Sequence, residues 1–254
     1  MSGNALSAPV DAAAVKVLLC DADGNLFASE EPAFAASTVV TNRLLEHLGI
    51  QRRFTALELR RRAVGRNFRA TASELLAEAG VRISAYELER WVLRERHEVT
   101  AHLASVLRTD DDVLEPLGIL ARHMRLVVVT SSARTRLDAC LAATQLDELC
   151  SPSVRFSAED SLPVPTSKPD PAIYAFAGAS LGISQTEGLA VEDAVAGVRS
   201  AVGAGFQTVG NLQFVPACER DARAAELLAA GACAVIPSWR HLADLLCAET
   251  HSAK

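Results

Sequence analysis

Two aspartates separated by one residue, Asp21 and Asp23, follow directly after the apolar run Val15 to Cys20. A short, nearly continuous apolar run is the pattern of a strand that is buried on both faces. Open α/β sheets bind their ligands at the carboxyl ends of such strands. The aspartate pair is therefore a candidate ligand site, with a turn of solvent-facing aspartates as the alternative.

A calcium loop is excluded by spacing. Acidic or amide residues alternate at Asp21, Asp23 and Asn25. A calcium loop also needs Gly at its sixth position and Glu at its twelfth. This chain has Leu26 and Pro32 at those positions.

Hydroxyl and ammonium groups follow later in the chain. Thr130-Ser131-Ser132 comes after the apolar run Leu126 to Val129, just before an expected helix whose N-terminus would favour an anion. The alternative role for one of these hydroxyls is a helix N-cap. Lys168 lies in the proline-rich loop Thr166 to Pro171, which fixes the backbone on either side of its ammonium group.

A second acidic pair, Glu192 and Asp193, ends the apolar run Gly188 to Val191. Two acids at a strand end repel each other unless a cation lies nearby. Small residues at Gly197 and Ala201 predict a helix that packs closely on the sheet.

Positioning these groups requires a sheet. Similar apolar runs recur at Thr208 to Val209 and at Ala232 to Ile236, and helix-length segments separate all the runs. Strands that alternate with helices predict an α/β fold with a parallel sheet covered on both faces.

The interval between the first two predicted strands, roughly 105 residues, is too long for one crossover. Its apolar periodicity predicts four helices, with Gly49 and Gly80 as stops after two of them. These helices are expected over Thr38 to Leu48, Leu57 to Val64, Ala70 to Ala79 and Tyr86 to Leu107. We therefore expect a flexible arm over residues 1–14, a core over 15–29 and 113–254, and a helical cap over 30–112. Hinges are expected at Glu30 to Pro32 and Asp110 to Pro116.

Composition limits the partners. The 254 residues carry a net charge of −6 with both signs interspersed, so neither nucleic acid nor a membrane is an expected partner. The basic run Arg60 to Arg62 is either a solvated helix face or a surface that contacts anions.

Six cysteines without a C-x-x-C pair, and no signal peptide or apolar span, predict a cytoplasmic protein. His97 and His102 are five apart, which does not fit the H-E-x-x-H zinc motif.

Taken in order, the four polar segments resemble the four motifs of the haloacid dehalogenase superfamily of hydrolases. The segment from Val191-Glu192-Asp193 through Ala204-Gly205 carries the most specific match. The resemblance is closest to the branch of beta-phosphoglucomutase and phosphoglycolate phosphatase, whose helical cap follows the first motif. It implies a Rossmann-like parallel core with an inserted helical cap.

The resemblance also implies roles for the motif residues. Asp21 would be the nucleophile and Asp23 the general acid and base, while Thr130 would bind a phosphoryl oxygen and Lys168 would neutralise charge. Ser131 and Ser132 would contribute to substrate binding. Mg²⁺ would be held by Asp21, Asp193 and the Asp23 backbone carbonyl, with Glu192 acting through a bound water.

Dehalogenases and phosphonatases of the superfamily lack an acid at the position of Asp23, so the resemblance favours a phosphate ester as substrate. A small phosphorylated metabolite is the expected partner of a monomer or homodimer. In the cap, Arg66 and Arg69 resemble residues of a loop that points toward the active site and are candidate substrate contacts. A phosphomutase and a non-catalytic ligand-binding protein remain alternatives.

The chain departs from the family pattern at three positions. Asn25 stands where Thr or Val is common, Ala28 where Asp is common, and Ala194 where Ser often follows the acidic pair. None of these changes removes a group with a named catalytic role, but Ala28 would alter hydrogen bonding at a hinge.

Overall fold

The computed structural model describes residues 10, 12–63 and 67–248, and it divides into two compact units. The first unit comprises residues up to Ala28 together with residues from Arg108 onward, and the second comprises Ser29–Leu107. The sequence predicts that the inserted helical domain ends at residue 112. In the structure the second unit ends at Leu107, five residues earlier.

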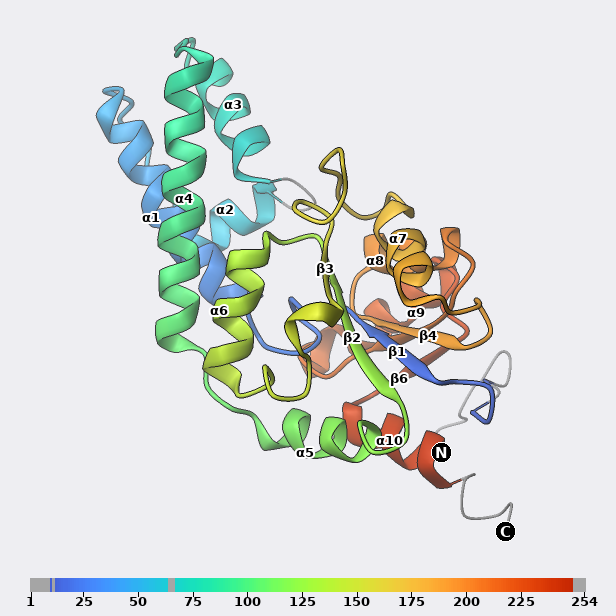
Figure 1. Ribbon diagram of the computed structural model, residues 1–254. Helices are drawn as coiled ribbons and strands as arrows, with labels where there is room; N and C mark the ends of the chain where they lie inside the picture. The colour runs from blue at the N-terminus through green and yellow to red at the C-terminus, as the bar shows by residue number, and fades with distance from the viewer. Residues whose placement is uncertain (1–9, 11, 64–66, 249–254) are drawn as a thin grey trace. The chain divides into compact units, whose positions relative to one another are not determined.

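The first unit contains a six-stranded sheet (Figure 1). Its strands are β1 (Val17–Cys20), β2 (Arg125–Thr130), β3 (Arg155–Ser157), β4 (Gly188–Glu192), β5 (Gln207–Asn211) and β6 (Ala234–Ile236). All neighbours pair in parallel in the order β3-β2-β1-β4-β5-β6. The predicted α/β class with a parallel sheet is therefore confirmed. Strand β3 was not predicted, because three residues are too few to show a periodic pattern.

The central strand β1 determines where a ligand can bind. Leu19 pairs with Val127 of β2 on one side and with Ala190 of β4 on the other. From β1 the chain proceeds outward through β2 and β3, then crosses to β4 and proceeds the opposite way through β5 and β6. The order reverses between β1 and β4, and in such sheets the carboxyl ends at the reversal form the binding crevice.

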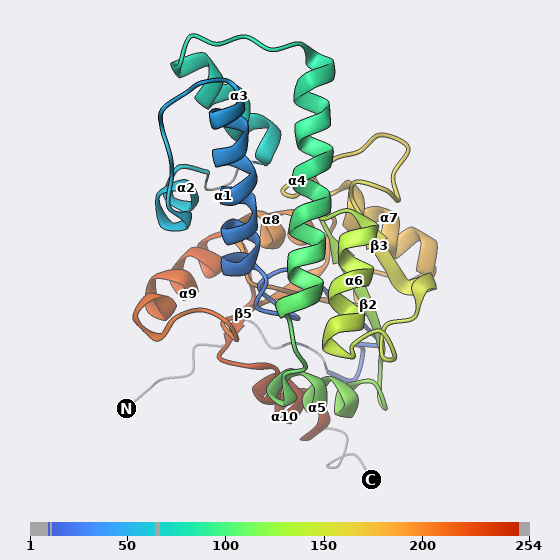
Figure 2. The ribbon, with the colours of Figure 1, turned by 90° about the vertical axis from the view of Figure 1, so that its left-hand side faces the viewer.

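Helices cover this sheet. They are α5 (Asp111–Leu120), α6 (Arg134–Thr144), α7 (Ala172–Leu181), α8 (Val195–Gly203), α9 (Arg220–Ala229) and α10 (Trp239–Ala248), with 3-10 turns at Pro152–Val154 and Ala217–Glu219. Helices α7, α8 and α9 pack in succession, and α5 packs against α10 (Figures 1 and 2). A buried cluster that includes Leu19, Val129, Ile173 and Phe206 joins the sheet to α7 and α8. In the described ranges no helix is long and apolar enough to span a bilayer.

The second unit is helical. It consists of α1 (Glu30–His47), α2 (Ala56–Ala63), α3 (Phe68–Glu78) and α4 (Ala85–Val106), with α1 packed along α4. A small core of Leu45, Phe54, Leu59 and Leu75 joins α1, α2 and α3. The helices expected from apolar periodicity are therefore present, and α1 and α3 end just before Gly49 and Gly80 as predicted.

Both segments expected as hinges are helical. Glu30 to Pro32 forms the first turn of α1, where the N–H group that proline lacks has no partner within the helix. The Asp110 side chain caps α5 by accepting a hydrogen bond from the Asp112 N–H at 3.0 Å, and Pro116 lies inside that helix. Polar residues and proline indicate a helix start as readily as a loop, which explains the difference.

Candidate active site

The carboxylate of Asp21 lies at the carboxyl end of β1, in the middle of the sheet. Its backbone N–H donates to the Val191 carbonyl at 3.0 Å, so the pairing of β1 with β4 continues through this residue. Only 8% of the residue is exposed. The chain then turns tightly, with the Gly24 N–H donating to the Phe27 carbonyl at 3.0 Å. This turn takes Asp23 away from the strand while Asp21 stays buried.

Asn25 connects the ends of three strands. Its side-chain amide donates to the carbonyls of Asp21 at 2.9 Å and Val191 at 3.0 Å, and its Oδ1 accepts from the Asn211 amide at 2.9 Å. The indole N–H of Trp239 donates to the Asn25 carbonyl at 2.8 Å. Asn25 is fully buried, so its departure from the family pattern has a structural role: it holds the ends of β1, β4 and β5 together. Asn211 was not among the predicted site residues, although it is a polar residue at the end of an apolar run.

Lys168 provides the positive charge of the site. Its ammonium group contacts Asp21 Oδ1, donates to Glu192 Oε1 at 2.6 Å and donates to the Val129 carbonyl at 2.8 Å. Its side chain is only 6% exposed. Burial alone would lower the pKa of Lys168, but the carboxylates of Asp21 and Glu192 hold it above its ordinary value, so the side chain stays charged. The ammonium group of Lys168 therefore contacts one carboxylate from each of the two acidic segments predicted from the sequence.

Glu192 is fixed from three sides. The buried hydroxyl of Tyr174 donates to its Oε1, the oxygen that also accepts from Lys168. Its other oxygen lies against Gly197, where an added Cβ would be 1.8 Å from Oε2. Gly197 was predicted to let a helix pack closely on the sheet, and α8 does pack on β4 and β5. The same glycine also makes room for this carboxylate. Tyr174 was not predicted; its signal is a phenolic hydroxyl in a helical segment where Ser180 is the one other polar side chain.

Asp21, Glu192 and Asp193 form a buried carboxylate group that could hold a metal ion. Each offers one oxygen, and these oxygens all lie within 4.8 Å of one another. Gly24, at a φ of 79°, allows the approach of Asp193, because a Cβ there would lie 2.4 Å from Asp193 Oδ2. Burial raises the pKa of Asp21 to about 8, although the nearby Lys168 acts in the opposite direction.

The charges of this group fit a divalent cation. With all three carboxylates ionised, Lys168 balances only one of the three negative charges. The donors are oxygen atoms, the type that Mg²⁺ prefers. The residues present therefore fit the Mg²⁺ implied by the family resemblance. The Asp23 carboxylate contacts other residues, and its backbone carbonyl stays a predicted ligand.

Asp23 is held by the segment that precedes and begins α6. The Ser132 hydroxyl donates to Asp23 Oδ2 at 2.6 Å, and Arg136 Nη2 lies 3.5 Å from Asp23 Oδ1. Arg136 was not among the predicted site residues, because an arginine in the first turn of a helix gives no sequence signal of its own. The structure thus separates an inner group around Lys168 from an outer pair of Asp23 and Arg136.

The three predicted hydroxyls face different partners. Thr130 is buried and its Oγ1 accepts from the Ser132 N–H at 3.0 Å, while Ser131 Oγ accepts from the Lys168 N–H at 3.1 Å. Helix α6 has Ala133 at its N-cap, so the alternative N-cap role for these hydroxyls is wrong. Ser131 instead connects the end of β2 to the loop that carries Lys168, whereas the Ser132 hydroxyl donates to Asp23. Phosphoryl binding by Thr130, and substrate binding by Ser131 and Ser132, stay predictions.

The two arginines predicted in the cap are placed differently. Arg66 lies outside the described residues. Arg69 lies on α3, and its guanidinium pairs with Glu89 at 2.6 Å. Its contact with substrate stays a prediction.

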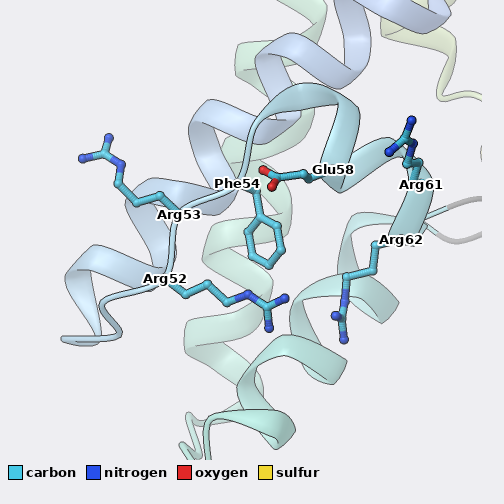
Figure 3. Close-up of a pocket in the computed structure, with 6 residues that line it drawn as sticks. All are labelled: Arg52, Arg53, Phe54, Glu58, Arg61 and Arg62. Atoms are coloured by element: carbon cyan, nitrogen blue, oxygen red, sulfur yellow. The ribbon is translucent and has the colours of Figure 1, made fainter.

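A pocket in the second unit collects four arginines (Figure 3). It is lined by Arg52, Arg53, Phe54, Glu58, Arg61 and Arg62. Arg52 and Arg62 point toward each other there, whereas Arg53 and Arg61 point away (Figure 3). The converging pair already contacts Glu78, and Arg62 also contacts Glu74 at 3.1 Å. Carboxylates of α3 therefore neutralise this pair, which favours the interpretation of the Arg60 to Arg62 run as a solvated face.

A family model described as haloacid dehalogenase-like hydrolase matches residues 19–211, a range that contains every motif residue described above. The chain belongs to this family. The predicted family and hydrolase class are thereby confirmed. No match was found among the curated proteins.

Solved structures share the fold over nearly the whole chain. A haloacid dehalogenase-like protein of unknown function from Agrobacterium tumefaciens is 26% identical, with a TM-score of 0.68 and coverage of 94% of this chain and 100% of the other. CbbY from Rhodobacter sphaeroides in complex with phosphate is 21% identical, with a TM-score of 0.69 and coverage of 90% and 96%. A predicted phosphoglycolate phosphatase from Haemophilus somnus is 19% identical, with a TM-score of 0.70 and coverage of 93% and 98%.

We expect Asn25→Ala to destabilise the hydrolase by about 2–4 kcal/mol, because two strand-end carbonyls and the Asn211 amide would lose buried partners. Urea denaturation of the variant and of Gln51→Ala, an exposed amide on the second unit, measures the difference. The control should change stability by less than about 0.5 kcal/mol. Equal stabilities would show that Asn25 does not connect the strand ends.

We expect Gly197→Ala to cost about 1–3 kcal/mol of stability, since the new methyl group must displace the buried Glu192 carboxylate. Gly118 in α5 is the matched control, because nothing lies within 4 Å of its added Cβ. Gly118→Ala should instead stabilise the protein by up to about 1 kcal/mol through helix propensity. Thermal denaturation of both variants tests the contrast, and a stabilising Gly197→Ala would contradict it.

Proposed function

We propose that this hydrolase cleaves a small phosphomonoester, and that Asp21 is its covalent nucleophile. The observation that carries the proposal is the contact of one ammonium group with two carboxylates: Lys168 contacts both Asp21 and Glu192 within a buried carboxylate group. A carboxylate beside a buried ammonium and a cation site is suited to approach an anionic phosphoryl group, because the charge repulsion is compensated.

In the first half of the proposed reaction, Asp21 attacks phosphorus and the bond to the ester oxygen breaks. The leaving oxygen takes a proton from Asp23, so the products are an aspartyl-phosphate and a neutral alcohol. Lys168 contacts Oδ1 of Asp21, so we assign the attack to the other oxygen, Oδ2. Ser132 and Arg136 hold Asp23 while it transfers the proton.

In the second half, Asp23 accepts a proton from water as the water oxygen attacks phosphorus. The bond to Asp21 breaks, inorganic phosphate leaves, and both aspartates return to their starting states. Tyr174 and Gly197 fix Glu192, which in turn fixes Lys168 against Asp21 throughout. We therefore assign Glu192 mainly to positioning Lys168, in addition to the water-mediated metal contact expected from the sequence.

Asp21, Asp193 and the Asp23 carbonyl are the proposed holders of Mg²⁺. When bound, Mg²⁺ supplies positive charge against the phosphoryl oxygens. Two residues of the protein position these ligands. Gly24 permits Asp193 to approach, and Asn25 fixes the turn that contains Asp21 and Asp23.

Two further observations support a phosphate ester as substrate. The carboxyl group of Asp23 is present and positioned by two donors, and proton donation is needed for an alkoxide leaving group. Among solved structures of the same fold, one holds phosphate and another is described as a predicted phosphoglycolate phosphatase.

Replacing the nucleophile tests the reaction directly. Asp21→Asn should lower phosphate release from a panel of small phosphomonoesters by about a thousandfold or more, as expected for loss of a nucleophile. Asp221→Asn, an exposed aspartate on α9, is the control and should retain wild-type rates. Substantial phosphate release by Asp21→Asn would refute covalent catalysis by this residue. Transfer of the phosphoryl group to a different hydroxyl of the sugar, with glucose 1-phosphate as substrate, would instead indicate a phosphomutase.

Removing the cation tests the metal assignment. Chelation by EDTA should abolish phosphate release, and added Mg²⁺ should restore it. Mg²⁺ should also raise the melting temperature of the wild type, since an ion that binds only the native state stabilises it. Asp193→Asn should lose most of this stabilisation. Full activity in EDTA, or an equal Mg²⁺ effect on both proteins, would exclude the proposed site.

A further inference from the structure

We propose that Arg223 is a positioning residue for Asp193 and that it thereby sets the affinity of the site for Mg²⁺. This inference rests on the proposed metal site. It adds to that site a residue of α9, a helix that contributes none of the groups described above.

The segment that carries Asp193 leads from the end of β4 into α8, and an alanine caps that helix. Ala194 is the N-cap residue, with a φ of −119° and a ψ of 145°. This extended backbone is typical of an N-cap, a position at which a serine hydroxyl accepts a hydrogen bond from the first helical turn. A methyl group cannot accept one. The departure from the family pattern at Ala194 therefore removes a local anchor next to the proposed metal ligand.

Arg223 holds this segment from another helix. Helix α8 begins at Val195, so the backbone carbonyl of Asp193 lies just before the helix. That carbonyl accepts a hydrogen bond from Arg223 Nη1 at 3.1 Å. Hydrogen bonds from charged donors are stronger than those between neutral groups. Because the carbonyl belongs to the ligand residue itself, the contact restricts the backbone from which the Asp193 carboxylate extends.

Helix α9 is a firm base for the contact. It packs on α8, β5 and β6. Leu227, one turn after Arg223, is fully buried in a cluster with Val198 of α8 and Leu212, which follows β5. The guanidinium therefore extends from a helix whose position relative to α8 is fixed, and it can hold the segment between β4 and α8 in one place.

The Asp193 carboxylate has little room to compensate for a movement of its backbone. It packs against the turn after β1, where an added Cβ at Gly24 would lie 2.4 Å from Asp193 Oδ2. One of its oxygens also lies within 4.8 Å of oxygens of Asp21 and Glu192. Mg²⁺ requires near-ideal octahedral coordination. A small displacement of the Asp193 backbone should therefore weaken Mg²⁺ binding.

The charge of Arg223 acts in the opposite direction to its hydrogen bond. A guanidinium repels a nearby cation, so a purely electrostatic role predicts tighter Mg²⁺ binding when the arginine is removed. Glu226 Oε2 lies 3.5 Å from Arg223 Nε and offsets part of this charge. The Arg223 side chain is 30% exposed, so salt and water screen the repulsion further. The sign of the change in Mg²⁺ affinity thus separates positioning from charge.

The experiment measures the Mg²⁺ concentration at which the rise in melting temperature is half complete. In Arg223→Gln this concentration should increase about tenfold, as is typical when a partner of a metal ligand is lost. Arg223→Lys keeps a charged donor and should show a smaller increase. Adding Ala194→Ser to Arg223→Gln should recover part of the affinity, because a serine cap would anchor the same segment. Arg199→Gln, at an exposed arginine on α8, is the control and should match the wild type.

Two results for folded Arg223→Gln overturn the proposal. An unchanged half-saturating Mg²⁺ concentration would mean that Arg223 supports the fold alone, and a lower one would mean that its charge dominates. Circular dichroism confirms folding, and Arg223→Lys is the second variant if the first does not fold. If Mg²⁺ leaves the melting temperature of the wild type unchanged, the proposed metal site fails and this inference fails with it. A wild-type response that Arg223→Gln shares in full overturns this inference alone.

Discussion

A buried ammonium group shared by two carboxylates is the interaction on which the site depends. Lys168 comes from a loop after β3, Asp21 from the end of β1 and Glu192 from the end of β4. Taking any one of these charges out of water would be unfavourable without the others. The shared ammonium therefore makes burial of the two acids tolerable and also keeps them close to the third, Asp193. The remaining negative charge is the physical basis for expecting a divalent cation.

The fold places Asp21 and Glu192 side by side because the parallel strands β1 and β4 end at the same edge of the sheet. Sheet order reverses between β1 and β4, so their carboxyl ends adjoin without a helix connecting them directly. Asn25 then connects the two strand ends through their carbonyls and extends the connection to β5 through Asn211. An amide can donate twice and accept at the same residue, which neither Thr nor Val can do. The substitution at this family position thus adds rigidity beneath the proposed nucleophile.

Sequence reasoning predicted the sheet and the motif residues well, because strand ends are marked by a change from apolar to polar side chains. It placed Asp21, Lys168, Glu192 and Asp193 in the same site before any distance was known, and the structure brings these four together. It did not identify Tyr174, Asn211 or Arg136, since their partners are distant in sequence and nothing local marks the contacts. It also missed a second role of Gly197, because nothing in the sequence shows that the carboxylate of the nearby Glu192 lies against this position.

The inner group around Lys168 and the outer pair of Asp23 and Arg136 are suited to two different tasks in the proposed reaction, nucleophilic attack and proton transfer. In the proposed reaction the inner carboxylates act in their ionised forms, which a bound cation favours against the burial that raises the pKa of Asp21. Contacts with Lys168, Tyr174 and Gly197 leave them little freedom. In the proposed reaction Asp23 instead exchanges a proton with the leaving group and then with water, which requires access from outside. Its partners Ser132 and Arg136 belong to the segment that precedes and begins α6, and both Asp23 and Arg136 remain about a quarter exposed. The proposed nucleophile is buried and the proposed acid-base residue, two positions later, is accessible; the tight reversal at Gly24 separates their environments.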